Sequence, residues 1–182
     1  MPPVATVAAP MNLRKWVNEH RDKLKPPVGN QCMYDEGDFI VMIVGGPNAR
    51  RDYHINTTEE FFYQIEGDMN LRILENGKPR DIVIREGDVF MLPANIPHSP
   101  QRPAGTVGMV VERKRPEGAV DKLRFNCEKC GAVLHEDTFE LENIVTQLKA
   151  AMEKFWSSDD LRTCKKCGAK LEKPTGPIMP VD

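Results

Sequence analysis

The spacing of hydrophobic positions changes twice along the chain, and each spacing predicts a different kind of element. Near the N-terminus, the apolar residues of "MNLRKWVNEHRDKL" fall on one helical stripe, with Asn12 placed to cap the helix. From Asp38 to about Arg113, short apolar runs alternate with turn residues, which is typical of strands. After Pro116, apolar residues return to helical spacing.

The middle region predicts a mainly β domain. Its runs "DFIVMIV", "EEFFYQIE", "GDVFMLP" and "TVGMVVER" are short and follow one another without a long helix between them. The dipeptide Asn76-Gly77 lies between apolar flanks and is a strong hairpin signal. This texture predicts an all-β barrel or sandwich.

The C-terminal region predicts a helix over "DTFELENIVTQLKAAMEKFW", with Asp137 and Glu140 forming a capping box. Its apolar stripe is most simply a face that docks on the β region or on a partner chain. The expected organisation is a β-barrel domain over 11–115 and a helical extension over 116–173, with flexible tails at 1–10 and 174–182.

Composition limits the classes of protein to consider. The chain has 182 residues, of which 40% are hydrophobic and 29% charged, and its formal net charge is −2. This balance gives no sign of a nucleic-acid partner or a membrane surface. The longest apolar run, "FIVMIV", is too short to span a bilayer. Because the start lacks the features of a secretory signal, we expect a cytoplasmic protein.

Four of the five cysteines form two C-x-x-C pairs, Cys127 with Cys130 and Cys164 with Cys167. Four thiolates make a tetrahedral site for zinc or iron, and the spacing alone does not separate the two metals. Such a site is saturated, so we interpret it as a staple for the C-terminal helix rather than a centre of chemistry. The fifth cysteine, Cys32, is expected to be a buried, small apolar residue.

Two polar blocks inside the β region predict another metal site: "HINTTEEFFYQIEG" begins at His54, and "GDVFMLPANIPH" ends at His98. On one continuous strand, His54 and Glu60 would lie roughly 20 Å apart. They can meet only if the chain bends between them, and the polar stretch "NTT" is a suitable place.

These blocks resemble the two signature motifs of the cupin superfamily, whose members are small jelly-roll β-barrels with a metal inside. The superfamily usually has a second histidine where this chain has Asn56. The resemblance therefore implies three ligands, His54, Glu60 and His98, and its phase selects Glu60 over Glu59. Two histidines and one carboxylate form the facial triad of non-haem Fe(II) oxygenases, with about three positions left open.

The strings "HINTTEEFFYQIEGDMNLRI", "GDVFMLPANIPHSPQRP" and "GMVVERKRPEG" further resemble the 3-hydroxyanthranilate 3,4-dioxygenase family, in its form with two C-x-x-C pairs, over about residues 11–173. The resemblance implies an extradiol-type Fe(II) dioxygenase acting on 3-hydroxyanthranilate and O2. Its product, 2-amino-3-carboxymuconate semialdehyde, cyclises to quinolinate, a precursor of NAD in the kynurenine pathway of tryptophan breakdown. It also implies a rubredoxin-like iron at the four cysteines.

The same resemblance directs attention to residues around the metal. Arg50 lies four residues before His54, and Arg102 lies four after His98, so both could hold a substrate carboxylate bidentately. The family implies substrate-binding roles for Asn30, Glu60 and Glu112. Glu112 could accept a proton from the substrate, and Arg102 could steady bound dioxygen.

Two alternatives stay open at this point. The first is another metal-dependent cupin dioxygenase, acting on a different carboxylated aminophenol or on a thiol. The second is a non-catalytic protein whose C-x-x-C pairs form a nucleic-acid-binding ribbon, which the net charge of −2 disfavours. A short barrel with an apolar C-terminal helix could also pair as a homodimer.

Overall fold

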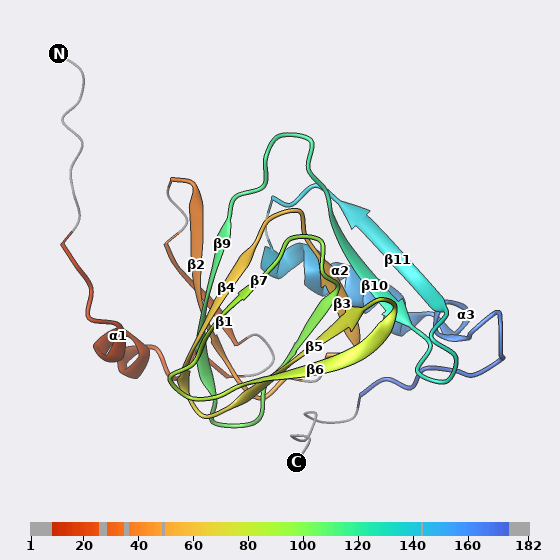
Figure 1. Ribbon diagram of the computed structural model, residues 1–182, viewed down its shortest axis with the longest axis horizontal. Helices are drawn as coiled ribbons and strands as arrows, with labels where there is room; N and C mark the ends of the chain where they lie inside the picture. Colours follow the sequence, from red (N-terminus) through yellow and green to blue (C-terminus); the bar gives the residue numbers. More distant parts are fainter. Residues whose placement is uncertain (1–8, 26–28, 35–36, 49, 143, 175–182) are drawn as a thin grey trace.

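Two antiparallel sheets make up most of the computed structural model, which describes residues 9–25, 29–34, 37–48, 50–142 and 144–174 (Figure 1). The five-stranded sheet has the order β1 (Asn30–Tyr34), β2 (Phe39–Gly45), β9 (Val107–Arg113), β4 (Glu60–Glu66) and β7 (Val89–Leu92). The six-stranded sheet has the order β11 (Val133–Phe139), β10 (Asp121–Asn126), β3 (Asp52–Ile55), β8 (His98–Gln101), β5 (Met69–Glu75) and β6 (Lys78–Ile84).

The main core lies between these sheets because alternate residues of each strand point to opposite faces. In β4, for example, Glu60, Phe62 and Gln64 are buried while the residues between them are partly exposed. The buried apolar cluster consists of Met42, Phe62, Met69, Leu71, Ile73, Ile84, Leu92 and Val110. The prediction of a mainly β fold is confirmed, although in the described residues no strand pair joins the two sheets into a closed barrel.

The hairpin predicted at Asn76-Gly77 is also confirmed. Both residues have positive φ angles, 53° and 75°, and they connect β5 to β6. Positive φ at both central positions is the requirement of a type I′ turn, which asparagine and glycine meet at the lowest cost.

Helix α1 (Leu13–Glu19) forms where the helical stripe predicts it. The side-chain oxygen of Asn12 accepts a hydrogen bond from the backbone N–H of Lys15 at 2.9 Å, as an N-cap does. Val17 of this helix packs with Leu24 and Ile43 in a second cluster, so α1 covers part of the five-stranded sheet.

The C-terminal helix begins later than the capping-box pattern predicts. Helix α2 (Ile144–Ser157) starts after Asp137, which instead lies in β11 opposite Leu123 of β10. The backbone groups of Asp137 are committed to that strand pair, and its carboxylate accepts from Lys154. The capping box is therefore wrong, and residues 121–139 add two strands to the sheet.

Helix α2 and the short helix α3 (Asp159–Arg162) close a third apolar cluster against β10 and β11. Phe155 stacks on Phe125, with ring centroids 3.6 Å apart, which fastens the helix to the sheet. Cys32 lies on the edge strand β1 and is exposed, so the expectation of a buried residue is wrong.

The expected tails at 1–10 and 174–182 lie almost entirely outside the described residues. Within the described ranges, none of the helices combines the length and the apolar character that crossing a membrane requires.

Candidate active site

His54, Glu60 and His98 come together between the two sheets. His54 lies in β3 and His98 faces it from the neighbouring strand β8, where the two are register partners. Glu60 begins β4 in the opposite sheet, so the chain crosses from one sheet to the other through residues 56–59. This crossing is the bend expected at "NTT". All three residues are buried, and their candidate ligand atoms lie within 4.8 Å of one another.

Each imidazole has one nitrogen committed to a protein oxygen and the other turned toward Glu60. His98 holds the Ile96 carbonyl oxygen with Nδ1 at 2.9 Å, and its Nε2 lies 3.1 Å from Glu60 Oε1. Since a carbonyl only accepts, Nδ1 carries the proton and Nε2 has the lone pair. His54 Nδ1 lies 3.7 Å from the same Glu60 oxygen.

Asn56 stands at the position where the motif of the resembled superfamily usually has its second histidine. In this structure its side chain forms a hydrogen bond with the carboxylate of Glu60. Its side-chain Nδ2 donates to Glu60 Oε1 at 2.8 Å. Its backbone carbonyl accepts from the N–H of Asn95 at 2.8 Å, which ties the two polar blocks together. Asn56 thus orients Glu60, and the donor set remains two imidazoles and one carboxylate.

The electrostatics around Glu60 favour its charged form. Burial alone would keep Glu60 neutral, but His98 and His54 outweigh burial and lower its pKa to about 2. Burial also opposes protonation of His98, yet attraction by Glu60 raises its pKa. At His54, burial prevails over its hydrogen bond to Asp121 and lowers the pKa, so the neutral imidazole is favoured.

The pKa of Glu112, next to Glu60, is shifted in the opposite direction. Glu112 is the direct cross-strand partner of Glu60, because β4 and β9 are in register at this pair. Burial, and then repulsion by Glu60, raise the pKa of Glu112 to about 8. Two neighbouring carboxyl groups with pKa values pushed apart are typical of an acid–base site.

The donor set fits a divalent iron. Three ligands of this kind, with buried and anchored side chains, form the facial arrangement of non-haem Fe(II) sites. Each histidine is oriented through its second nitrogen, as metal-bound histidines almost always are. Among the residues of the described ranges, only this group and the cysteine group meet the requirements for a metal cluster.

The two arginines expected near the metal have different surroundings. Arg50 forms a fork with Asp52, with Nε 3.2 and 3.1 Å from the two carboxylate oxygens. Burial opposes its charge, but Asp52, and more weakly Glu60 and Glu112, outweigh burial and raise its pKa. The Arg50 guanidinium is therefore close enough to the cluster to feel both carboxyl groups.

Arg102 is buried and has no ion pair within the described part of the chain. Its one side-chain hydrogen bond goes from Nη1 to Gln64 Oε1 at 3.1 Å, while Nε has no partner. Burial lowers its pKa to about 10. A buried cation without a counter-charge is costly, and an anionic ligand would supply the missing charge.

Asn30 begins the edge strand β1 opposite Val44. The contacts of the described residues do not join its side chain to the histidines. A cavity of about 530 Å³ is lined by Arg50, Tyr53, Ser99 and residues of the first cysteine turn, and by none of the three ligands, so Arg50 borders a space other than the histidine site. Since Tyr53 and Ser99 are chain neighbours of His54 and His98, this cavity is on the other face of the sheet.

Two functional residues were missed by the sequence reasoning, Arg115 and Asp121. Asp121 Oδ2 lies 2.7 Å from His54 Nε2, and Arg115 lies between Asp121 and Glu112. Asp121 is 67 positions from His54, so no local spacing could indicate the pair. Only the pairing of β10 with β3 brings them together.

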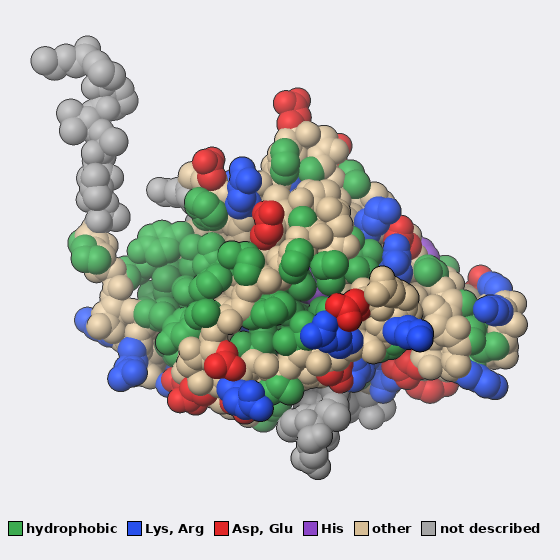
Figure 2. All heavy atoms as spheres, in the orientation of Figure 1, with side chains coloured by type: hydrophobic (Ala, Val, Ile, Leu, Met, Phe, Trp, Pro, Cys, Tyr) green, Lys and Arg blue, Asp and Glu red, His purple; other side chains and the backbone are tan. Residues whose placement is uncertain are grey.

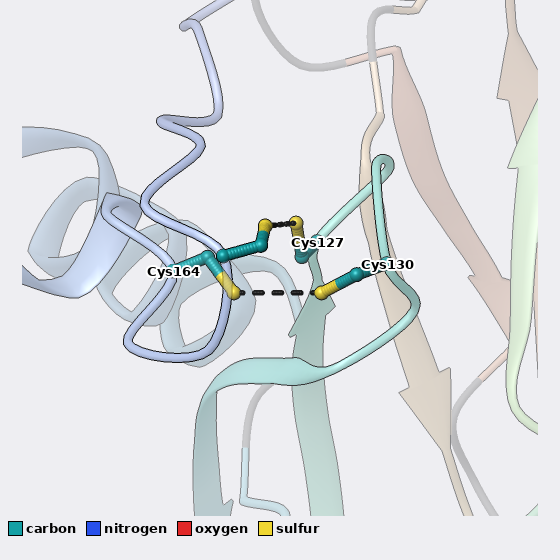
Figure 3. Close-up of side chains that lie close together, drawn as sticks. Cys127, Cys130 and Cys164 are labelled. Carbon is teal, nitrogen blue, oxygen red and sulfur yellow. Dashed lines mark hydrogen bonds between the residues drawn. The ribbon is translucent and has the colours of Figure 1, made fainter.

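The four cysteines form a second cluster between two matching turns (Figure 3). Cys127 Sγ lies 3.6 Å from Cys167 Sγ, and Cys130 Sγ lies 3.6 Å from Cys164 Sγ. A disulfide would require about 2.0 Å. A tetrahedral metal with sulfur ligands at about 2.3 Å would place the sulfurs about 3.8 Å apart, so the spacing fits a metal.

The two turns repeat the same backbone hydrogen bonds. Gly131 N–H donates to the Cys127 carbonyl at 2.8 Å, and Gly168 N–H donates to the Cys164 carbonyl at 2.9 Å. Both glycines have a φ of 72°, a conformation that glycine adopts without a steric cost. Backbone N–H groups lower the pKa of Cys164 to about 6. At Cys167 the backbone N–H of Ala169 acts in the same direction, but burial and the neighbouring thiols outweigh it and raise the pKa to about 11.

Comparison with known proteins agrees with this geometry. The sequence profile of the 3-hydroxyanthranilic acid dioxygenase family matches residues 5–156. A Neurospora crassa protein named 3-hydroxyanthranilate 3,4-dioxygenase is 52% identical over 162 residues, covering 89% of each chain. A Candida albicans protein of the same name is 52% identical over 159 residues, covering 87% of this chain and 92% of the relative. The chain belongs to the 3-hydroxyanthranilic acid dioxygenase family.

Membership of this dioxygenase family agrees with a buried group of residues that could hold a metal ion. Solved structures add little to the family assignment. One of the similar structures, a cupin-2 domain protein from Shewanella frigidimarina, matches this chain with a TM-score of 0.40. It is 17% identical and covers 46% of this chain and 78% of that one. The family assignment therefore depends on the sequence matches.

Proposed function

We propose that the protein is a non-haem Fe(II) dioxygenase that opens the ring of 3-hydroxyanthranilate with O2, giving 2-amino-3-carboxymuconate semialdehyde. The observation that carries the proposal is the buried cluster of His54, Glu60 and His98. It occurs in a chain that is 52% identical to a Neurospora crassa protein named 3-hydroxyanthranilate 3,4-dioxygenase. The product would cyclise to quinolinate and supply NAD biosynthesis. The expected site of action is the cytoplasm.

Iron held by these three side chains would supply open positions at which the substrate and O2 meet. The protein's own part is to keep the donors in place. Asn56 holds Glu60 through a buried contact, and the Ile96 carbonyl holds His98 through a partly buried one. His98 and His54 outweigh burial and lower the pKa of Glu60 to about 2, so its carboxylate is charged and can bind a cation.

Glu112 is proposed as the proton acceptor. Its carboxyl group is the cross-strand neighbour of the ligand Glu60, so it lies beside the place where a substrate hydroxyl or amino group would dock. A pKa of about 8 in the metal-free protein is near the operating pH, as general acid–base catalysis requires.

Arg102 and Arg50 are proposed to bind the substrate carboxylate. Arg102 supports this role through its burial and its lack of a carboxylate partner among the described residues. Arg50 would have to share its guanidinium between Asp52 and the ligand. Asn30 remains a proposed substrate contact, based on the family resemblance. Arg102 is also proposed to steady O2.

The four cysteines are proposed to hold a second iron or zinc with a structural role. Four sulfur ligands leave no open position for a substrate. The two turns that carry them join β10 to the segment after α3, so a metal there fastens the C-terminal helices to the sheet.

We further propose that two copies pair through the outer face of the five-stranded sheet. Two rows of apolar side chains cross that face: Val41, Val111, Phe61 and Met91 form one, and Met109, Tyr63 and Val89 form the other, which ends at Ile43 beneath α1. Met91 and Val89 are 56% and 62% exposed. Figure 2 shows hydrophobic side chains gathered over β2, β9, β4 and β7.

A patch this continuous usually marks an interface. Sedimentation of the wild type should show a dimer, and Met91→Asp should give a monomer. A monomeric wild type at micromolar concentration would contradict the pairing.

Turnover tests the enzyme assignment directly. Freshly reduced, iron-loaded protein mixed with 3-hydroxyanthranilate in air should consume one O2 per substrate and form a new absorbing product. A panel with other carboxylated aminophenols and a thiol substrate should show a clear preference for 3-hydroxyanthranilate. Turnover of another panel member in its place would assign a different dioxygenase activity.

A further inference from the structure

A continuous chain of buried polar side chains leads from the metal ligand His54 to Glu112. His54 Nε2 lies 2.7 Å from Asp121 Oδ2. Arg115 holds the same carboxylate with Nε at 2.7 Å and Nη2 at 2.8 Å. Arg115 Nη2 also lies 2.7 Å from Glu112 Oε2, as an ion pair without the alignment of a hydrogen bond, because that oxygen has no hydrogen-bond partner among the described residues. The side chains of all four residues are at most 4% exposed.

Asp121 decides which nitrogen of His54 can bind a metal. An ionised carboxylate only accepts hydrogen bonds, and both oxygens of Asp121 face the Arg115 guanidinium, with Nε 2.7 Å from Oδ1 and Nη2 2.8 Å from Oδ2, as in an arginine–carboxylate ion pair. The proton of the neutral imidazole must therefore be on Nε2. The lone pair is then on Nδ1, the nitrogen that faces Glu60.

The guanidinium group of Arg115 is fixed by hydrogen bonds from all three of its nitrogens. Its Nη1 donates to Thr58 Oγ1 and to the Arg113 carbonyl, both at 3.0 Å, and its other nitrogens hold Asp121. Thr58 belongs to the segment that crosses between the sheets. A guanidinium fixed in this way offers Glu112 a partner at a constant position, which a flexible lysine ammonium could not do.

We propose that Asp121 and Arg115 are positioning residues, which hold the ligand His54 and the carboxyl group of Glu112 in one fixed arrangement. The inference rests on the proposed function for the roles of His54 and Glu112. Neither residue touches the substrate. Asp121 acts through the orientation and tautomer of His54, and Arg115 acts by linking Asp121 to Glu112.

The first experiment measures metal affinity rather than turnover. The protein, with its cysteine site filled, is titrated with Fe(II) in competition with a chelator under anaerobic conditions. Asp121→Asn should weaken Fe(II) binding at the histidine site about 10- to 100-fold, the usual effect of removing such a partner. The metal at the cysteine site should stay bound, because a general loss of stability would not select one site.

A matched control is available in the same sheet. Arg72 and Asp81 form an equivalent fork, with Nε 2.8 Å and Nη2 2.9 Å from the carboxylate oxygens, but on the surface. Asp81→Asn should leave Fe(II) affinity unchanged. Equal affinities in Asp121→Asn and Asp81→Asn would overturn the proposal.

Arg115→Lys separates the two roles. Its kcat should fall about tenfold or more because Glu112 is no longer held, while its KM should change little and Fe(II) should still bind. The surface variant Arg72→Lys should keep the kcat of the wild type. A kcat of Arg115→Lys equal to that of the wild type would remove the link to Glu112.

A measurement on the wild type avoids any doubt about folding. Nitrogen NMR of the protein loaded with diamagnetic Zn(II) should show His54 protonated on Nε2. Protonation on Nδ1 would overturn the proposal whether or not the variants fold. Because the NMR and affinity measurements need no substrate, a failure to turn over 3-hydroxyanthranilate would leave them standing and would count only against the proposed function.

Discussion

The two candidate metal sites of this chain differ in how their ligands are assembled. The histidine site takes its three donors from β3, β4 and β8, which belong to two sheets. The cysteine site takes four donors from two short turns with the same backbone hydrogen bonds. At the histidine site, the side chains of His98 and His54 outweigh burial and lower the pKa of Glu60. At the cysteine site, hydrogen bonds from backbone N–H groups are the main cause of the lowered pKa of Cys164.

Under the proposed function, this difference would separate a site for chemistry from a site for structure. Three donors would leave open positions on a metal, and the donor Glu60 has a pKa of about 2, whereas its cross-strand neighbour Glu112 has a pKa of about 8. Four sulfurs saturate a tetrahedral metal, so that site can contribute folding energy but cannot hold a substrate. The predictions below test this division, beginning with the largest effect.

Removing one histidine ligand should abolish activity and spare the second metal. In His98→Ala, two donors remain, which is too few for a stable Fe(II) site. Turnover should fall to background, and metal analysis should find about one metal per chain instead of two. The control His20→Ala, at the C-cap of α1, should keep both metals. Loss of both metals in His98→Ala would mean that the two sites are not separate.

Removing one cysteine should have the reverse effect. Cys164→Ser should lose the cysteine-bound metal and several kcal/mol of stability, because metal binding at such a site is folding energy. At a temperature where the variant stays folded, its iron-loaded activity should remain near that of the wild type. Cys32→Ser, which changes an exposed cysteine on β1, should match the wild type in both measurements. Unchanged stability in Cys164→Ser would refute the structural role.

Glu112→Gln should reduce kcat by about 10²- to 10⁴-fold, the usual contribution of general acid–base catalysis. Iron content should not change, since Glu112 is not a ligand. The neighbouring, exposed Glu59 provides the matched control, and Glu59→Gln should be fully active. Steady-state kinetics and metal analysis on the same samples decide the outcome. A normal kcat in Glu112→Gln would exclude the proposed proton transfer.

The raised pKa of Glu112 should also appear in the stability of the metal-free protein. Its pKa moves from 4.5 to about 8 on folding, so between these values the folded state keeps a proton that the unfolded chain releases. Stability is therefore lost as pH rises through this window, by up to about 1.4 kcal/mol per pH unit for this group. Urea unfolding from pH 5 to 9 should show that the free energy of unfolding of Glu112→Gln rises relative to that of the wild type as pH rises. A constant difference would contradict the shift.

Gly108→Ala should have the smallest effect. A Cβ at this position would meet Arg102 Nη1 at 2.6 Å and Gln64 Oε1 at 2.7 Å, so it would displace the buried guanidinium. If Arg102 binds the substrate carboxylate, KM should rise about tenfold, which corresponds to about 1.4 kcal/mol, with kcat less affected. Gly77→Ala, at an exposed turn where a Cβ meets no neighbour, should leave KM unchanged.

The sequence predicts the local parts of this molecule well. Asn76-Gly77 requires a particular turn, and the glycine after each C-x-x-C pair permits a tight turn. Both signals depend on neighbours in the chain, and both correspond to what the structure shows. The bend between His54 and Glu60 could also be anticipated, because a straight strand would keep the two apart.

Interactions between distant segments could not be predicted in this way. The helical spacing after Leu141 continued backwards to Asp137 only by coincidence, and pairing with β10 made that residue part of a strand. Arg115 and Asp121 carry no local signal in the sequence, because Asp121 meets His54 only through the pairing of β10 with β3. Cys32 was expected inside because of its residue type, whereas its position on an edge strand leaves it exposed.

Strand β10 has a consequence for how the protein would fail under oxidising conditions. It begins at Asp121, which contacts His54, and Cys127 follows its last residue, Asn126. A peroxide that oxidised the thiolates would release one end of a strand only about 20 Å long. Because Asp121 at the other end stays held by Arg115 and His54, such damage would lower the temperature at which the enzyme unfolds before it reached the histidine site.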